Sequence, residues 1–169
     1  HYQLGVYNGQ GINLADANKA KDIIGTLQIQ PVKGLYLGAF AWKGDWVNGK
    51  GETLKRERFS AGLKYDVNNW TVRAEYATAI AGEKEQTGAA DALYFTVGVP
   101  VVDWMKVYLK WDEFRAHGNA ESSHDMYSAC VNFRLHKNLN FQLEYRHHNN
   151  KLLPTPQFND LWFMTYIRF

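Results

Sequence analysis

The sequence ends in residues 159–169, NDLWFMTYIRF, where apolar and polar residues alternate. Because successive side chains of a β-strand point to opposite faces, such a stretch presents one apolar face and one mixed face. The apolar set reaches the last residue of the sequence and comprises Leu161, Phe163, Thr165, Ile167 and Phe169. This pattern is typical of the closing strand of an antiparallel transmembrane β-barrel. We expect Phe163, Thr165, Ile167 and Phe169 to act as the signal read by the barrel-assembly machinery.

The composition agrees with a barrel that crosses a membrane with strands. The 169 residues include six Trp, ten Tyr and nine Phe, yet the mean hydropathy is −0.44. Barrel strands average out as polar because outward and inward residues alternate, and no apolar run approaches the ~18 residues of a membrane helix. The formal net charge of +2 gives no strong field, so we expect no nucleic-acid partner. The single cysteine, Cys130, cannot form an internal disulfide.

Period-two alternation recurs along the whole sequence, and we predict one domain over residues 1–169. No linker or low-complexity tract divides it. Glycine and alanine obscure the two faces of the third segment, which we leave unassigned. The ten expected strands cover residues 2–10, 22–30, 34–43, 55–66, 69–81, 91–101, 104–115, 124–135, 138–148 and 159–169.

The connections alternate in length, which is the second sign of a membrane barrel. Short connections are expected near residues 31–33, 67–68, 102–103 and 136–137, and long ones near 11–21, 44–54, 82–90, 116–123 and 149–158. Outer-membrane barrels have short periplasmic turns and long external loops. A soluble barrel would turn the same apolar face inward, but the loop asymmetry favours the outer membrane of a Gram-negative bacterium. The lipid would then contact the apolar face, and Trp46, Phe59, Trp111 and Tyr145 would form an interfacial aromatic girdle near the long-loop rim.

The sequence allows two ways for the ten expected strands to belong to a closed barrel. An open sheet cannot sit in lipid, because its edge strands would leave backbone groups without hydrogen bonds. Either ten strands close on themselves, or these residues form part of a larger barrel.

Several short motifs resemble those of phosphate-selective porins O and P. They are Tyr7-Asn8-Gly9-Gln10-Gly11-Ile12-Asn13, Lys21-Asp22, Pro31-Val32-Lys33-Gly34-Leu35 with Gly38, and Lys110-Trp111-Asp112, followed by the terminal strand. Members of that family are sixteen-stranded porins, usually trimeric. The resemblance therefore implies a C-terminal part of a sixteen-stranded barrel, without its N-terminal strands, and a homotrimer as the assembly. The constriction loop lies in the other half of such proteins, so the resemblance does not extend to phosphate selectivity.

The mixed face carries more basic than acidic residues. Its nine predicted pore-lining bases are Arg56, Arg58, Lys64, Arg73, Lys106, Lys110, Arg134, Arg146 and Arg168. Its five predicted pore-lining acids are Asp66, Glu75, Asp112, Glu144 and Asp160. A positively charged wall of low dielectric constant attracts anions. We therefore predict passive diffusion of small hydrophilic solutes with a mild anion preference. In the alternative interpretation, these charges pair across strands and only hydrate the wall.

Two other functions fit parts of the sequence. His117, His124-Asp125 and His147-His148 cluster near the long-loop rim with Asp112-Glu113, and a complete ten-stranded barrel could use such groups as a protease-like site. No family motif supports that activity, so we predict no enzyme and no catalytic residue. Neighbouring strand residues such as His147 and His148 point to opposite faces, and we predict no metal and no cofactor. A structural or adhesive barrel could instead bind partners through loops near residues 42–51 and 152–158.

Overall fold

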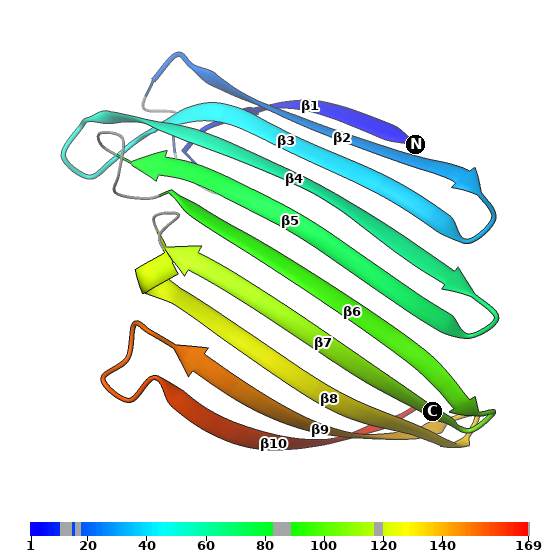
Figure 1. The fold of residues 1–169 in the computed structure, drawn as a ribbon. Coiled ribbons are helices and arrows are strands. Elements are labelled where there is room, and N and C mark those ends of the chain that lie inside the picture. Colours follow the sequence, from blue (N-terminus) through cyan, green and yellow to red (C-terminus); the bar gives the residue numbers. More distant parts are fainter. Residues whose placement is uncertain (11–14, 16–17, 83–88, 117–119, 169) are drawn as a thin grey trace.

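The computed structural model describes residues 1–10, 15, 18–82, 89–116 and 120–168. In these residues the chain forms one antiparallel sheet of ten strands, and each strand pairs with the next in sequence (Figure 1). The prediction of an all-β antiparallel fold with ten strands is confirmed. No helix within the described ranges is long and apolar enough to cross a membrane.

The ten strands are long, and only a short 3-10 turn, η1 (Ala120–Ser122), interrupts their succession in the described residues. The strands are β1 (Tyr2–Asn8), β2 (Lys21–Val32), β3 (Leu35–Val47), β4 (Thr53–Val67), β5 (Trp70–Gly82), β6 (Ala90–Val102), β7 (Met105–Ala116), β8 (Ser123–His136), β9 (Leu139–Asn150) and β10 (Gln157–Ile167).

The connection between β3 and β4 is shorter than the predicted residues 44–54. The two strands stay paired as far as Val47 and Thr53. The turn is closed by hydrogen bonds from the Asn48 N–H to the Glu52 carbonyl and from the Gly51 N–H to the Asn48 carbonyl, both 3.0 Å. The sequence prediction failed because Gly44 interrupts the alternation within β3. The long connection expected over residues 44–54 is therefore wrong.

The other connections follow the predicted alternation in length. Asn68 and Asn69 have φ angles of 51° and 65° and form a two-residue hairpin turn between Val67 and Trp70, the geometry that matches strand twist. Figure 1 places the hairpin turns that follow β2, β4, β6 and β8 together at one end of the sheet. Residues 11–14, 16–17, 83–88 and 117–119 of the predicted long connections lie outside the described residues, as does Phe169 of the predicted assembly signal.

The large apolar side chains lie on the outside of the sheet and not in a core. Tyr2, Leu109, Leu161 and Phe163 are 80%, 61%, 68% and 66% exposed. Among the described hydrophobic residues, only Leu54 and Cys130 are buried. An apolar face that is exposed and not packed in a core is what a sheet in contact with lipid requires.

The sheet is open, with one free edge at β1 and the other at β10. β1 pairs only with β2, and β10 pairs only with β9, so β1 and β10 form the two edges. The hydrogen bonding between the first and last strands that a closed ten-stranded barrel requires is absent from the described residues.

Candidate functional site

The strand register brings the predicted pore-lining residues to one side of the sheet, except Arg168, which follows the end of β10. Residues that face each other across antiparallel strands point to the same side. Arg73 lies opposite Lys64 and Thr96, and Arg146 lies opposite Ser128 and Asp160. We call this side the polar face. It consists of the even-numbered residues of β2 to β4 and β6 to β10 and the odd-numbered residues of β5. The opposite side is the apolar face.

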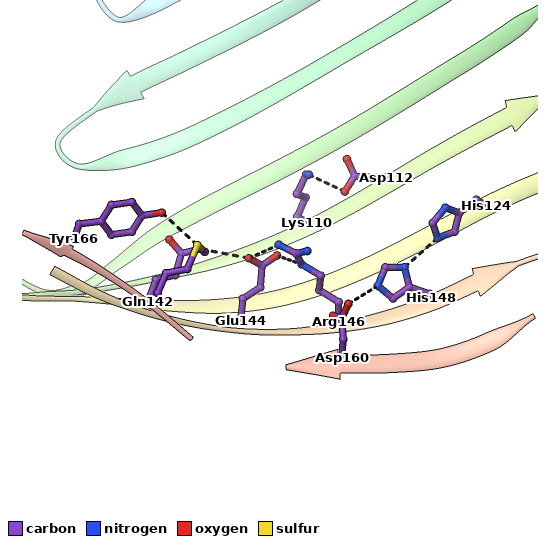
Figure 2. Close-up of polar contacts among 10 residues, drawn as sticks. Lys110, Asp112, His124, Gln142, Glu144, Arg146, His148, Asp160 and Tyr166 are labelled. Atoms are coloured by element: carbon purple, nitrogen blue, oxygen red, sulfur yellow. Dashed lines mark hydrogen bonds and ion pairs between the residues drawn. The ribbon is translucent and has the colours of Figure 1, made fainter. Parts of the chain in front are cut away.

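Several charges of the polar face pair along a strand with a residue two positions away. The Arg146 guanidinium donates hydrogen bonds of 2.8 and 3.0 Å to the Glu144 carboxylate (Figure 2). Lys110 Nζ lies 2.8 Å from Asp112 Oδ2 in the same view. Asp66 serves two bases, with Lys64 Nζ at 3.1 Å and Arg73 Nη2 at 3.7 Å. Part of the basic charge is thus compensated, mostly along strands and less across them.

Six of the predicted bases also lie over aromatic rings of the polar face. Cationic groups within about 6 Å of a ring centroid are attracted by the ring. The distances to the centroid are 4.8 Å for Arg58 over Trp42, 4.7 Å for Arg146 over Trp162, 5.1 Å for Lys106 over Tyr108, 5.5 Å for Lys64 over Tyr36, 5.9 Å for Lys110 over Tyr94, and 5.3 and 5.6 Å for Arg56 over Trp42 and Trp46. The contacts with the rings of Tyr36, Trp42 and Trp46 were missed because the faces of β3 could not be assigned from the sequence. The contacts with Tyr94, Tyr108 and Trp162 depend on side-chain positions that alternation does not give.

Trp46 was misplaced because the faces of β3 could not be assigned from the sequence. The sequence analysis expected it in an aromatic girdle toward lipid. It lies instead on the polar face, where the guanidinium of Arg56 covers its ring. The girdle position of Trp46 is therefore wrong, because the parity of β3 is fixed by pairing with β4 and not by its own ambiguous pattern.

Asp22 is an acid of the polar face that the sequence analysis did not include. Its side chain is 1% exposed, and its carboxylate accepts a 2.8 Å hydrogen bond from the Trp42 indole N–H. Arg56 Nη1 lies 3.8 Å from the same carboxylate oxygen and donates a 3.1 Å hydrogen bond to the Gly9 carbonyl. The position was missed because Asp22 stands at the start of β2, beside Lys21. Its inclusion gives six acids against nine bases.

A family described as Gram-negative porin matches residues 2–152. The chain belongs to the Gram-negative porin family. A search of the curated proteins found no match. Members of this family are channels of the outer membrane, so the predictions of an outer-membrane β-barrel porin and of its location are confirmed.

The charge on the polar face of this porin is not fully compensated. Arg58 is exposed, and no carboxylate of a described residue lies within ion-pairing distance of it. The same holds for Arg134 near the end of β8. Lys106 donates a 2.8 Å hydrogen bond to the neutral hydroxyl of Thr71. These three groups give the polar face an excess of positive charge.

The histidines of this porin are divided between the two faces. On the polar face His124 Nε2 lies 3.0 Å from His148 Nδ1, and His148 Nε2 lies 3.4 Å from Asp160 Oδ2 (Figure 2). His147 points to the other face, where its Nδ1 lies 2.8 Å from Asn159 Oδ1.

The structure therefore does not bring together all of the polar residues expected at the rim. Asp125 and Glu113 lie on the apolar face, opposite to His124 and Asp112 on the polar face, and His117 lies outside the described residues. Within the described part of the chain, no group of three or more His, Cys, Asp or Glu residues could hold a metal ion.

Proposed function

We propose that the polar face is the wall of a water-filled channel through which small hydrophilic solutes diffuse passively, with a mild preference for anions. The observation that supports this proposal is the uncompensated charge of Arg58 and Arg134 on a face that carries nine bases and six acids. A low-dielectric wall with a positive excess raises the local concentration of anions.

The cation–π contacts of the basic side chains hold their charges in place, so the electrostatic field at the polar face is fixed and does not fluctuate. Lysine and arginine side chains carry about 2 kcal/mol of rotamer entropy, so a free side chain would spread its charge over many positions. Arg58 is held over Trp42 and Arg146 over Trp162, at 4.8 and 4.7 Å. The positive charge is thereby kept close to the wall, which leaves the centre of the channel to water and solute.

The narrower resemblance to phosphate-selective porins O and P stays a hypothesis. It rests on short motifs, of which residues 11–13 lie outside the described residues. Inorganic phosphate and chloride should therefore be compared directly. A much higher permeability to phosphate would extend the proposal from a general anion preference to a selective one.

We further propose that additional strands preceding β1 in the natural protein complete the barrel. The free edges of β1 and β10 would each expose unpaired backbone N–H and C=O groups to lipid, and each such group costs several kcal/mol. The partners expected of the completed barrel are outer-membrane lipid, two further copies in a homotrimer, and the assembly machinery that reads β10. Cross-linking of the detergent-solubilised natural protein would test the trimer.

The anion preference is tested by reversal potentials. The full-length porin in a planar bilayer should give, in a KCl gradient, a zero-current potential displaced toward the chloride equilibrium potential. The double variant Arg58→Gln/Arg134→Gln should move the potential toward zero. Lys43→Gln removes a charge from the apolar-face set of β3 and is the matched control, which should leave the potential unchanged. A cation-selective wild-type channel would contradict the proposal.

A further inference from the structure

The polar face contains an apolar recess toward the long-loop end. Its floor is made by four alanines on two paired strands, where Ala77 faces Ala92 and Ala79 faces Ala90. Two adjoining hollows of about 260 and 460 Å³ lie over this floor, and both are lined by Ala77, Ala92 and Phe114. We call this region the alanine recess. Exposed apolar patches in a wet environment mark binding sites, and these volumes are of the order found for small-molecule sites.

Much of the wall of the alanine recess is aromatic or apolar. Phe40 of β3 lines the smaller hollow and Met126 of β8 lines the larger one. Phe114, which both hollows share, is 43% exposed although it faces the polar side. An exposed phenylalanine over an alanine floor is unfavourable in contact with water alone. A flat apolar group of a solute could cover this surface and exclude water from it.

One edge of the alanine recess carries a positive charge. Arg58 lines the smaller hollow, lies opposite Ala79 and is exposed. Its guanidinium lies 4.8 Å from the centre of the Trp42 ring, and no described carboxylate pairs with it. Carboxylates line the hollows as well: Glu75 lines both, Asp91 lines the smaller one, and Asp112 and Glu113 line the larger one. Asp91 is paired with Arg115, and Glu75 is four residues along β5 from Ala79, roughly 13 Å for an extended strand. Among the described residues that line the two hollows, Arg58 is the one lysine or arginine, so a negatively charged group has its favourable position at Arg58 and away from the carboxylates.

We propose that the alanine recess binds aromatic carboxylates and makes their passage selective. The ring would lie on the alanine floor between Phe40 and Phe114, and the carboxylate would accept hydrogen bonds from the Arg58 guanidinium, which can hold a carboxylate with two parallel bonds. This inference rests on the proposed channel function and adds a solute class to it.

Benzoate is the probe that combines both features, and two compounds separate them. Acetate has the carboxylate without the ring, and benzyl alcohol has the ring without the charge. Added to the full-length porin in a planar bilayer under constant KCl, benzoate should reduce the chloride current reversibly and with saturation. Acetate and benzyl alcohol should need concentrations higher by about tenfold, since each loses one part of the binding energy.

Two substitutions locate the binding. Arg58→Gln should weaken the benzoate effect by about tenfold, as expected for loss of a charge-assisted hydrogen bond. Ala79→Gln should have a similar effect by filling the floor while leaving the charge of Arg58 in place. Arg134→Gln removes a polar-face charge at the far end of the strands and is the comparison: it lowers only the general attraction of anions and should weaken the benzoate effect far less than Arg58→Gln.

The result that would overturn the inference is distinct from failure of the channel itself. A conducting porin on which benzoate and acetate act equally, or on which Arg58→Gln and Arg134→Gln weaken benzoate equally, shows plain electrostatic attraction without a recess site. A further chain segment over the recess would also overturn it. In that case Ala79→Cys, in a Cys130→Ser background, would not react with a bulky water-soluble thiol reagent. Absence of any conductance would contradict the proposed function as well.

Discussion

Gly44 of β3 lies so close to Asp22 of β2 that a methyl group on Gly44 would overlap the Asp22 carboxylate. That carboxylate also receives the Trp42 indole N–H and faces Arg56, so one buried acid connects β2, β3 and β4 on the polar face. Gly44, which interrupts the apolar and polar alternation of β3 in the sequence, is thus the residue that makes room for the Asp22 carboxylate. Trp42 also lies under the guanidinium groups of Arg56 and Arg58. The position of Asp22 therefore helps to fix these charges on the polar face.

Gly44→Ala is expected to destabilise the porin. Overpacking of a filled site costs about 1–3 kcal/mol. The measurement is the urea midpoint of the protein folded in detergent micelles, followed by far-ultraviolet circular dichroism. Gly49→Ala is the control, because no atom lies within 4 Å of a methyl group placed there. Equal midpoints for the two variants would contradict the packing described for Asp22.

Asp22→Ala is expected to destabilise the same region by a different route. It leaves the Trp42 indole N–H without its acceptor, and a buried unsatisfied group costs about 1–3 kcal/mol. It also removes the carboxylate that pairs with Arg56, which keeps its hydrogen bond to the Gly9 carbonyl. The loss should appear as a lower urea midpoint together with an altered tryptophan emission spectrum. Asp45→Ala, on the apolar-face set of β3, should change the free energy of unfolding by no more than about 0.5 kcal/mol. A wild-type midpoint for Asp22→Ala would show that the carboxylate is dispensable.

These residues also show how far the sequence could predict the structure. Alternation predicted the ten strands and the sides of Arg58, Arg146 and Phe163, because the side-chain period of a strand is two whatever it pairs with. It could not assign β3, where glycine and alanine occupy both sets of positions. The parity of β3 follows from pairing with β4, which is a contact between distant residues. The alanine recess was missed for the same reason, since its floor becomes visible only when Ala77 and Ala92 are brought side by side.

Glu144→Gln is expected to increase the anion preference of the channel. The substitution removes a negative charge from the polar face and releases the Arg146 guanidinium, which now donates two hydrogen bonds to Glu144. The zero-current potential in a KCl gradient should move further toward the chloride equilibrium potential. Glu113→Gln removes an acid from the apolar face of β7 and should produce no such movement. If both variants shifted the potential equally, the charge of the whole protein and not of the polar face would govern selectivity.

Phe163 and Met164 provide a direct test of which face touches lipid, because they are neighbours in β10 with side chains on opposite faces. Phe163 is 66% exposed on the apolar face, and Met164 lies opposite Gln142 on the polar face. An arginine on the lipid side of a barrel costs about 2–4 kcal/mol near the bilayer midplane. Phe163→Arg should therefore fold poorly into lipid vesicles, as read from the heat-modifiable band on a gel, whereas Met164→Arg should fold normally. The reverse order would place water on the apolar face and would contradict the membrane arrangement.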